Sequence, residues 1–480
     1  VYHVQQLTKE RNIAEAEAEK AQAVTNFLTG VFEYASPYTQ PNAEITAREV
    51  LDRGTEYLND EFTDQPDIKM SLLKSVGSIY SVLGSYDKAD SLLTNAYEIN
   101  REISDLPENE SLGVIHYYLG KVKLGRGDFK GSIEHNKEAT KIFSGLNLLG
   151  FKAQSLDLWG WNEYRLANYE KADSLLQLAL SLNKEFYGVT SEYTAGTMQK
   201  IGWIHSARGE YEKADSLFTE ALNIRNSLID GDHPEKATTL HSLGWIKHQM
   251  GKNEEAIALY NEAIPMRNRL FNDRPHPDTG WSLNNLGVIY MAEQRFDEAE
   301  QLFLEALEIR REVLPETHPH ITQTLGNLGS VYYFKEDYEE SISVLTEVLA
   351  IQKSLLGDKH PALATHLNNL AVVSENSGEP YNALPLYREA ISILQTHFET
   401  GHPTTLKMRG NLARLLDELE QYDEAEKLFL QNYETVKEKN GPDASQTLEH
   451  LRDLVDFYTK WEKPAKERHY MAILDDYTKK

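Results

Sequence analysis

The sequence has no cysteine, and it has only 16 prolines and 28 glycines among its 480 residues. Without cysteine the chain cannot use thiol catalysis, form disulfide bonds or hold zinc through thiolates. The absence would suit an oxidising compartment but does not establish one. No run approaches 18 consecutive apolar residues, so we expect no segment of this sequence to span a bilayer.

Basic residues are also scarce, because 49 Lys and Arg stand against 75 Asp and Glu, giving a net charge of −26. This balance argues against nucleic acid or an anionic membrane surface as a partner, since both require clustered cations to neutralise phosphates. Hydrophobic residues make up only 40% of a chain whose length alone would predict about three globular domains. Apolar residues nevertheless recur at helical spacing, which predicts an ordered, helical chain.

A repeat of about 42 residues runs through most of the sequence. A small residue follows an apolar one at intervals of 40 to 43 residues, at Gly77, Gly120, Gly160, Gly202, Gly244, Gly287, Gly329, Ala371 and Ala413. An aromatic ring follows nine residues later in seven of these repeats, and another small residue follows after twelve. A degenerate tenth repeat lies near Val455. We number positions in each repeat from this small residue, so that −2 precedes it by two.

Each repeat is predicted to form two helices. In the sixth repeat, Leu283, Leu286, Gly287 and Tyr290 form one apolar stripe, and a second stripe begins at Phe296 after a short turn. The small residues are expected where two helices approach closely. One hairpin cannot bury its own apolar face, so neighbouring hairpins must stack on it. The pattern therefore predicts an all-α solenoid of about ten helix hairpins.

A His-Pro pair recurs between repeats, at His233, His276, His318, His360 and His402. Proline suits the first turn of a helix, where its missing N–H would have no partner. A metal site is the alternative interpretation, but residues one repeat apart lie too far from each other to share an ion with bonds of about 2 Å. We therefore interpret these histidines as turn and capping residues.

These columns of residues resemble tetratricopeptide repeats. The 42-residue period is similar to the long subtype found in kinesin light chains, as in HPALATHLNNLAVVSENSGEPYNALPLYREAISIL from His360 to Leu394. The resemblance extends from about Lys69 to Lys460 and implies a right-handed superhelical solenoid. It is specific for the fold and much less so for function, because such solenoids serve many partners.

The first 66 residues do not follow the repeat. Residues 1–36 contain an amphipathic helix with Val24, Phe27 and Val31 on one side, and it would serve as a juxtamembrane or capping helix. Within residues 37–66, Thr46 and Glu49 form a capping box that opens a second helix, which we expect to cap the array as a degenerate first unit. The solenoid itself is expected over residues 67–480, ending in a degenerate capping repeat.

This segment carries a second, narrower resemblance. KERNIAEAEAEKAQAVTNFL, FEYASPYTQPNAEITAREVLDRG and the first repeat, SVGSIYSVLGSYDKADSLL, look like the region that follows the membrane helix in bacterial serine/threonine kinases with tetratricopeptide repeats. The resemblance implies the sensor or scaffold half of such a kinase, outside the cytoplasm, with a membrane tether upstream of Val1. Without an upstream membrane helix it would be cytoplasmic. Because the chain begins at Val1 rather than Met, we expect a piece of a longer protein.

The first helix of each repeat is expected to line a concave groove that binds an extended peptide or protein. Candidate binding residues are of two kinds, amides near position −2 and aromatic residues near position +1. They are Asn284, Asn285, Asn327, Asn368, Asn369, Asn411, Trp161, Trp203, Trp245, Tyr164, His248 and Tyr333. An amide can pair with a peptide backbone, and tryptophan offers a large contact area. In the kinesin light chain resemblance, asparagines of this motif contact cargo peptide.

Both groups also have a structural interpretation, because the amides could tie neighbouring helices together and the tryptophans could pack between first helices. Lys74, Lys121, Lys200, Lys407 and Arg414 do not assemble into the clamp that recognises acidic chaperone tails. With the negative charge, a basic or apolar extended partner is expected.

Four functional classes follow from these patterns. The leading one is a non-catalytic binding solenoid of a receptor kinase. A soluble intracellular receptor for a signalling oligopeptide and a general scaffold for complex assembly are alternatives, and a homodimer stays open. An enzyme is the least favoured, because no Gly-rich phosphate loop, HRD or DFG triplet, nucleophile–base set or metal triad is present, so neither cofactor nor metal is expected.

Overall fold

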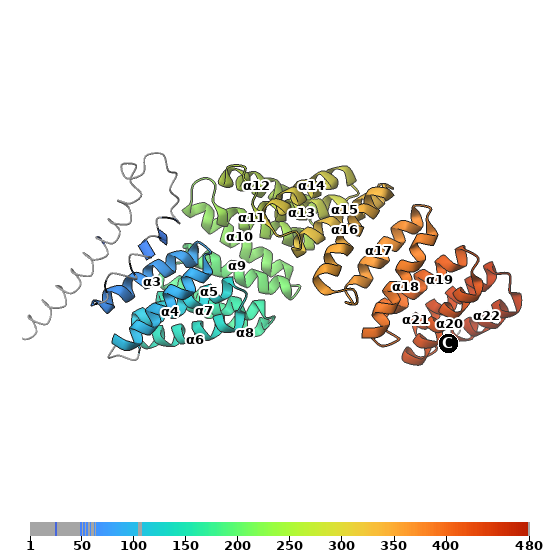
Figure 1. The fold of residues 1–480 in the computed structure, drawn as a ribbon, viewed down its shortest axis with the longest axis horizontal. Coiled ribbons are helices and arrows are strands. Elements are labelled where there is room, and N and C mark those ends of the chain that lie inside the picture. Colours follow the sequence, from blue (N-terminus) through green and yellow to red (C-terminus); the bar gives the residue numbers. More distant parts are fainter. Residues whose placement is uncertain are drawn as a thin grey trace, which may run out of the picture. The chain divides into compact units, whose positions relative to one another are not determined.

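The computed structural model describes residues 64–103 and 108–478, together with a few positions before residue 64. In these ranges every regular element is a helix, and the helices α3 to α22 follow one another as antiparallel hairpins (Figure 1). The prediction of an all-α array of about ten hairpins is confirmed. The helix predicted within residues 1–36 and much of the segment 37–66 lie outside the described residues.

The array divides into two compact units, residues 1–231 and residues 232–480. Unit 1 contains four hairpins: α3 (Pro66–Val82) with α4 (Tyr86–Ile103), α5 (Glu110–Gly125) with α6 (Phe129–Gly145), α7 (Leu149–Arg165) with α8 (Tyr169–Phe186), and α9 (Glu192–Ala207) with α10 (Tyr211–Leu228). The repeat pattern does not mark this division, since its period continues unchanged across residue 231.

Unit 2 contains six hairpins. They are α11 (Pro234–Gln249) with α12 (Asn253–Phe271), α13 (Pro277–Ala292) with α14 (Phe296–Val313), α15 (Pro319–Phe334) with α16 (Tyr338–Leu356), α17 (Leu363–Asn376) with α18 (Pro380–His397), α19 (Pro403–Glu418) with α20 (Tyr422–Asn440), and α21 (Ser445–Lys460) with α22 (Pro464–Thr478). Within each unit, every helix packs against the next one along the chain.

The small residues of the repeat lie where the two helices of a hairpin are closest. A methyl group on Gly287 would come within 2.8 Å of the Phe303 ring, and one on Gly329 within 2.8 Å of Leu345. The small residues at position +12 are fully buried on the facing helix. In two hairpins they also bond across the contact, because Ser132 Oγ donates to the carbonyl of Gly120 and Ser341 Oγ to that of Gly329. The predicted close approach is confirmed, and the obstacle is mainly a side chain of the second helix.

Every hairpin turn has a residue with left-handed backbone at position +7. Its φ lies between 53° and 85° in all ten repeats, at Gly84, Gly127, Ala167, Gly209, Gly251, Gln294, Glu336, Gly378, Glu420 and Glu462. Only five of these residues are glycine, the type that adopts this conformation without strain. Glu462 holds the same position in the degenerate tenth repeat, which therefore keeps the turn after losing the small residues.

Four of the recurrent histidines, His233, His276, His318 and His402, cap the helices that follow them, as predicted, whereas His360 lies just before a turn that leads into α17, whose N-cap is Ala362. His233, His276, His318, His360 and His402 each accept a hydrogen bond at Nδ1 from the backbone N–H two residues later, at 3.2 to 3.3 Å. The bond satisfies one of the N–H groups that a helix start leaves without an internal partner.

Described positions before α3 pack on the first hairpin. Leu58 is fully buried in the hydrophobic cluster of α3, α4 and α5, and Tyr80 Oη donates a hydrogen bond to the Asp52 carboxylate. Cover of this kind shields the apolar face of a solenoid's first repeat from water.

Candidate functional site

The predicted amides lie on the first helices of unit 2, and four of them bond in pairs. Asn327 Nδ2 donates to Asn284 Oδ1 at 3.2 Å, and Asn411 Nδ2 donates to Asn368 Oδ1 at 2.9 Å. Each pair joins position −3 of one repeat to position −2 of the next. In unit 1 the ion pair between Asp157 and Lys200 joins the same two positions. We call such a pair a rung.

One rung is anchored in the interior by a buried arginine. Asn284 Oδ1 also accepts from Arg310 at 3.3 Å and from Thr324 Oγ1 at 3.2 Å, and Asn284 is only 1% exposed. Burial lowers the pKa of Arg310 to about 10. The amides of this rung therefore tie neighbouring helices together, which is the structural interpretation that the sequence left open.

Rungs are absent where position −3 is glycine. The −3 residue is Gly326 in the seventh repeat and Gly410 in the ninth. The −2 residues of the repeats that follow them are Asn369 and Asp453. Asn369 is exposed and makes no side-chain hydrogen bond within the described residues. Among the predicted amides, Asn369 is exposed and Asn285, Asn327 and Asn411 are half-buried, so these four keep surface that a partner could contact. Asn284 and Asn368 are buried.

Two other predicted residues of unit 2 bond within it. Asn285 Nδ2 donates to Tyr260 Oη at 3.3 Å, and His248 Nδ1 lies 3.0 Å from Asn253 Oδ1. Both side chains are half-buried.

The predicted tryptophans are divided between the units. Trp161 and Trp203 lie in unit 1, where Trp161 stacks on Tyr164 at 4.8 Å between ring centroids and Trp203 meets Phe218 edge-on at 5.4 Å. Trp245 lies in unit 2, 6.2 Å from the His248 ring. Each tryptophan is half-buried, so each packs on its own hairpin and keeps part of its surface open.

Further aromatic surface lies along the first helices of unit 2, and part of it was not predicted. Tyr333 is half-buried and contacts Tyr338 and the exposed Phe334. Trp281, at position −6 of the sixth repeat, is 43% exposed and lies edge-on to His320 at 5.0 Å. Sequence reasoning missed Trp281 because tryptophans were compared only at position +1, although −6 belongs to the same helix face.

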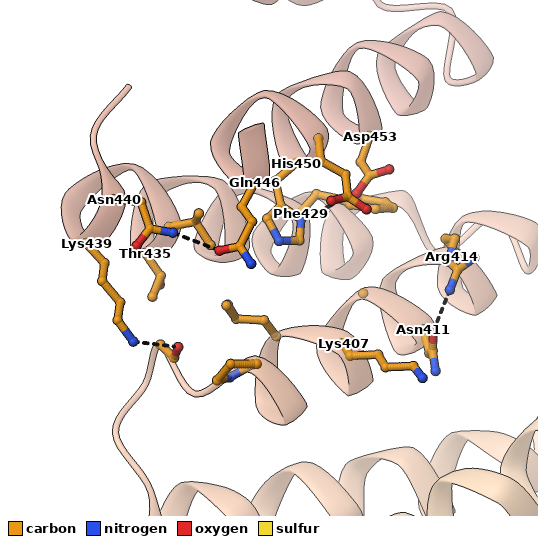
Figure 2. Close-up of a pocket in the computed structure, with 16 residues that line it drawn as sticks. Lys407, Asn411, Arg414, Phe429, Thr435, Lys439, Asn440, Gln446, His450 and Asp453 are labelled. Carbon is orange, nitrogen blue, oxygen red and sulfur yellow. Dashed lines mark hydrogen bonds and ion pairs between the residues drawn. The ribbon is translucent and has the colours of Figure 1, made fainter. Parts of the chain in front are cut away.

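A pocket of about 350 Å³ lies among α19, α20 and α21 (Figure 2). The first helix α19 contributes Lys407, Asn411 and Arg414, at positions −6, −2 and +1. Positions −2 and +1 are those at which the sequence predicted a groove, and −6 lies on the same helix face. Sequence reasoning gave Asn411 as the binding residue there, but it did not predict a pocket.

Gly410 explains why the pocket opens at this repeat. It occupies the −3 position that carries Asn284 or Asn368 in the rungs, and a methyl group built on it would find only Asn432, at 3.7 Å. The apolar floor consists of Leu406, Phe429 and Val436. A missing side chain at a single helix position thus leaves a concave site between two first helices.

The described ranges provide neither a cluster of metal ligands nor a helix that could span a membrane. No group of three or more His, Asp or Glu residues is arranged there to hold a metal ion. None of the helices described combines the length and the hydropathy needed to cross a bilayer.

Comparison with known proteins identifies the repeat. A tetratricopeptide repeat family model matches residues 153–227, 208–269, 278–354, 320–396 and 362–438, and a second model of the same description matches residues 242–312. No curated protein sequence matches the chain.

Solved structures share the fold at low sequence identity. The tetratricopeptide sensor protein PH0952 of Pyrococcus horikoshii, a signal transduction ATPase with numerous domains, is 15% identical, with a TM-score of 0.54 over 75% of this chain and 55% of that one. The quorum sensor NprR of B. thuringiensis, without ligand, is 14% identical, with a TM-score of 0.54 over 76% of this chain and 98% of that one. The structure of nearly identical tetratricopeptide-like repeats from a putative kinesin light chain of Podosopora anserina is 24% identical, with a TM-score of 0.40 over 43% of this chain and 98% of that one.

Proposed function

Because this chain belongs to the tetratricopeptide repeat family, we propose that it is a non-catalytic solenoid that binds an extended peptide or protein segment along its first helices. The observation that carries the proposal is the pocket on α19, whose lining residues Asn411 and Arg414 occupy the predicted groove positions −2 and +1. Lys407 lines the pocket from the same helix face. The open amide of Asn369 lies on the preceding first helix. Concave sites with a few convergent polar groups are the usual places for ligands.

The parent protein in this proposal is a bacterial membrane-bound serine/threonine kinase, with this chain as its extracytoplasmic sensor or scaffold. The support is the resemblance of the segments from Lys9 to Leu28 and from Phe32 to Gly54 to the region that follows the membrane helix of such kinases. Reading the gene upstream of the Val1 codon tests this part. A hydrophobic span preceded by HRD and DFG motifs is expected, and an upstream region with neither would contradict it.

A second candidate is a soluble receptor for a signalling oligopeptide. The shared fold with the quorum sensor NprR favours this class, although at 14% identity the likeness concerns the fold alone. The upstream sequence separates the two candidates, because only the first requires a membrane helix there.

Peptide selection tests the binding function itself. A random dodecapeptide library is selected on the immobilised chain, and the dissociation constants of enriched peptides are measured for the wild type and for Asn369→Ala. We expect Asn369→Ala to weaken binding several-fold at an unchanged melting temperature, because this amide makes no internal bond. Lys427→Ala, an exposed change on the second helix α20, is the matched control. Failure to enrich any peptide, or equal affinity for Asn369→Ala, would contradict the proposal.

A further inference from the structure

The two long walls of the α19–α21 pocket carry opposite charge. Figure 2 shows Lys407 and Arg414 on α19, and His450 and Asp453 on α21 across the pocket. Glu449 also lines the pocket from α21. Lys407 and Glu449 occupy the same position, −6, in the ninth repeat and in the tenth repeat when it is numbered from Val455.

No ion pair joins these walls within the described residues, although they are complementary. Arg414 donates instead to Asn411 on its own helix, and Asp453 lies 3.4 Å from His450 on its own helix. Lys439 donates to the backbone carbonyl of Gly401 at 3.4 Å. In unit 1, by contrast, Lys200 and Asp157 on neighbouring first helices pair directly. The glycine at position 410 therefore leaves opposite charges that face each other across a space they do not span.

We propose that this pocket is a bipolar slot that selects an acidic and a basic residue placed side by side in the extended segment of a partner. The inference rests on the proposed function and adds a specificity to it. In an extended chain successive side chains point to opposite sides. A segment lying between α19 and α21 therefore directs one side chain toward Lys407 and Arg414 and the next toward Glu449 and Asp453.

The apolar floor explains why the pairing is selective. The floor of the slot consists of the buried side chains of Leu406, Phe429 and Val436. A bound segment that lies on this floor is partly shielded from water. Ion pairs gain strength in such surroundings, and a wrong charge facing either wall costs affinity. The slot thus rejects all-acidic and all-basic segments, which the overall charge of −26 alone would not predict.

The test uses the full chain and five pools of acetylated, amidated decapeptides. Each pool has random flanks of four residues and a fixed central pair: Glu-Lys, Lys-Glu, Glu-Ala, Ala-Lys or Ala-Ala. Retention on the immobilised protein is measured by mass spectrometry. We expect one of the two charged orders to be retained about tenfold more than Ala-Ala, because two partly shielded ion pairs form.

Two variants show whether the slot is responsible. The double exchange Lys407→Glu with Glu449→Lys makes each wall neutral overall, because Arg414 and Asp453 stay in place, so the preference for one charged order should be lost. Gly410→Asn inserts the side chain that fills this space in the rungs and should abolish the preference. Lys427→Asn, an exposed change on the second helix α20, is the matched control. Circular dichroism establishes that each variant is folded.

The outcomes separate this inference from the proposed function. Equal retention of all five pools, or a preference that survives both Gly410→Asn and the charge exchange, would overturn the slot. If dodecapeptides from the random library still bind in that case, binding along the first helices stands without it. If neither the pools nor the library bind, both proposals fall.

Discussion

At the scale of single residues, one hairpin carries a polar pair where its neighbours are apolar. Arg409 occupies position −4, where most repeats have leucine, and Asn432 occupies position +19, where most have alanine. Arg409 is fully buried, and its Nη1 donates to Asn432 Oδ1 at 3.0 Å. Its Nε and Nη2 have no hydrogen-bond partner. Burial lowers the pKa of Arg409. The charge is therefore held in the core by one amide.

Removing that amide should destabilise the hairpin strongly. We expect Asn432→Ala to lower the free energy of unfolding by about 3–5 kcal/mol, because it leaves a buried charge without a partner. The double variant Arg409→Leu with Asn432→Ala restores the apolar pattern of the other repeats and should recover most of this loss. Urea unfolding followed by circular dichroism measures both effects. Equal destabilisation by the single and double variants would contradict the account.

A second polar pair makes stability depend on pH. His116 and His135 face each other with their Nδ1 atoms 2.9 Å apart, at positions −4 and +15, where most repeats have leucine. Burial lowers the pKa of His116 to about 4, with a smaller contribution from His135, and it lowers the pKa of His135 as well. In the unfolded chain both imidazoles titrate near 6.5.

The unfolded state therefore binds more protons than the folded state between about pH 6.5 and 4. The stability that these groups contribute is present above pH 6.5 and is lost as the pH falls through this window, by up to about 1.4 kcal/mol per pH unit for one histidine. We expect His116→Leu with His135→Leu to flatten the fall in unfolding midpoint between pH 6.5 and 5. If the unfolding midpoint of the double variant falls with pH as steeply as that of the wild type, these histidines do not cause the fall.

Residue-level prediction from the sequence succeeded where a column of identical residues carried the signal. The five histidines of the His-Pro pairs are such a column, since each bonds only to the backbone N–H two residues later. The fate of Asn284 was not predictable in that way. Asn284 is buried against Arg310 and against Thr324 of the next repeat. Predicting this burial requires knowing how neighbouring repeats stack.

At the scale of elements, the hairpin turn is the most regular feature. Half of the repeats have a residue other than glycine at position +7, although φ is positive in all of them. We expect Glu336→Gly to raise the free energy of unfolding by about 1 kcal/mol, because glycine adopts this conformation without strain. Gly378→Ala, at the same position of the next repeat, should lower it by a similar amount. Thermal melts of the two variants measure these changes in stability. Melting temperatures that shift in the same direction would contradict the expectation.

The helix hairpins themselves were predictable because each is specified locally. The small residue at position 0 and the ring at +9 mark one first helix and the start of one second helix, as at Gly287 and Phe296. The pocket was not predictable from this pattern. The pocket arises because Gly410 has no side chain, and a single missing side chain leaves no periodic pattern in the sequence.

At the scale of the whole molecule, each of the two units has hydrophobic clusters of its own. The cluster that contains Ala172 and Ile224 belongs to unit 1, and the cluster that contains Ala256 and Ala306 belongs to unit 2. Repeat arrays draw their stability from each hairpin and its immediate neighbours. Each unit should therefore be able to fold without the other.

We expect a fragment of residues 232–480 to keep its helical circular dichroism and to unfold cooperatively. A fragment of residues 252–480 is the control, because it removes α11 and exposes the buried Ala256 and Tyr260 of α12. It should unfold at a lower urea concentration. If residues 232–480 do not fold alone, or both fragments are equally stable, the division at Gly231 does not describe the energetics.

The central claim is that the first helices bind an extended segment, and a photo-crosslink tests it most directly. p-Benzoylphenylalanine is placed at position 365 on α17, an exposed position on the same helix face as Asn369, or at the control position 427 on α20. Each chain is irradiated with a dodecapeptide selected from the random library. The account predicts efficient crosslinking at position 365 and little at position 427, with mass spectrometry locating the joined peptide. Equal crosslinking at both positions, or crosslinking only at 427, would contradict it.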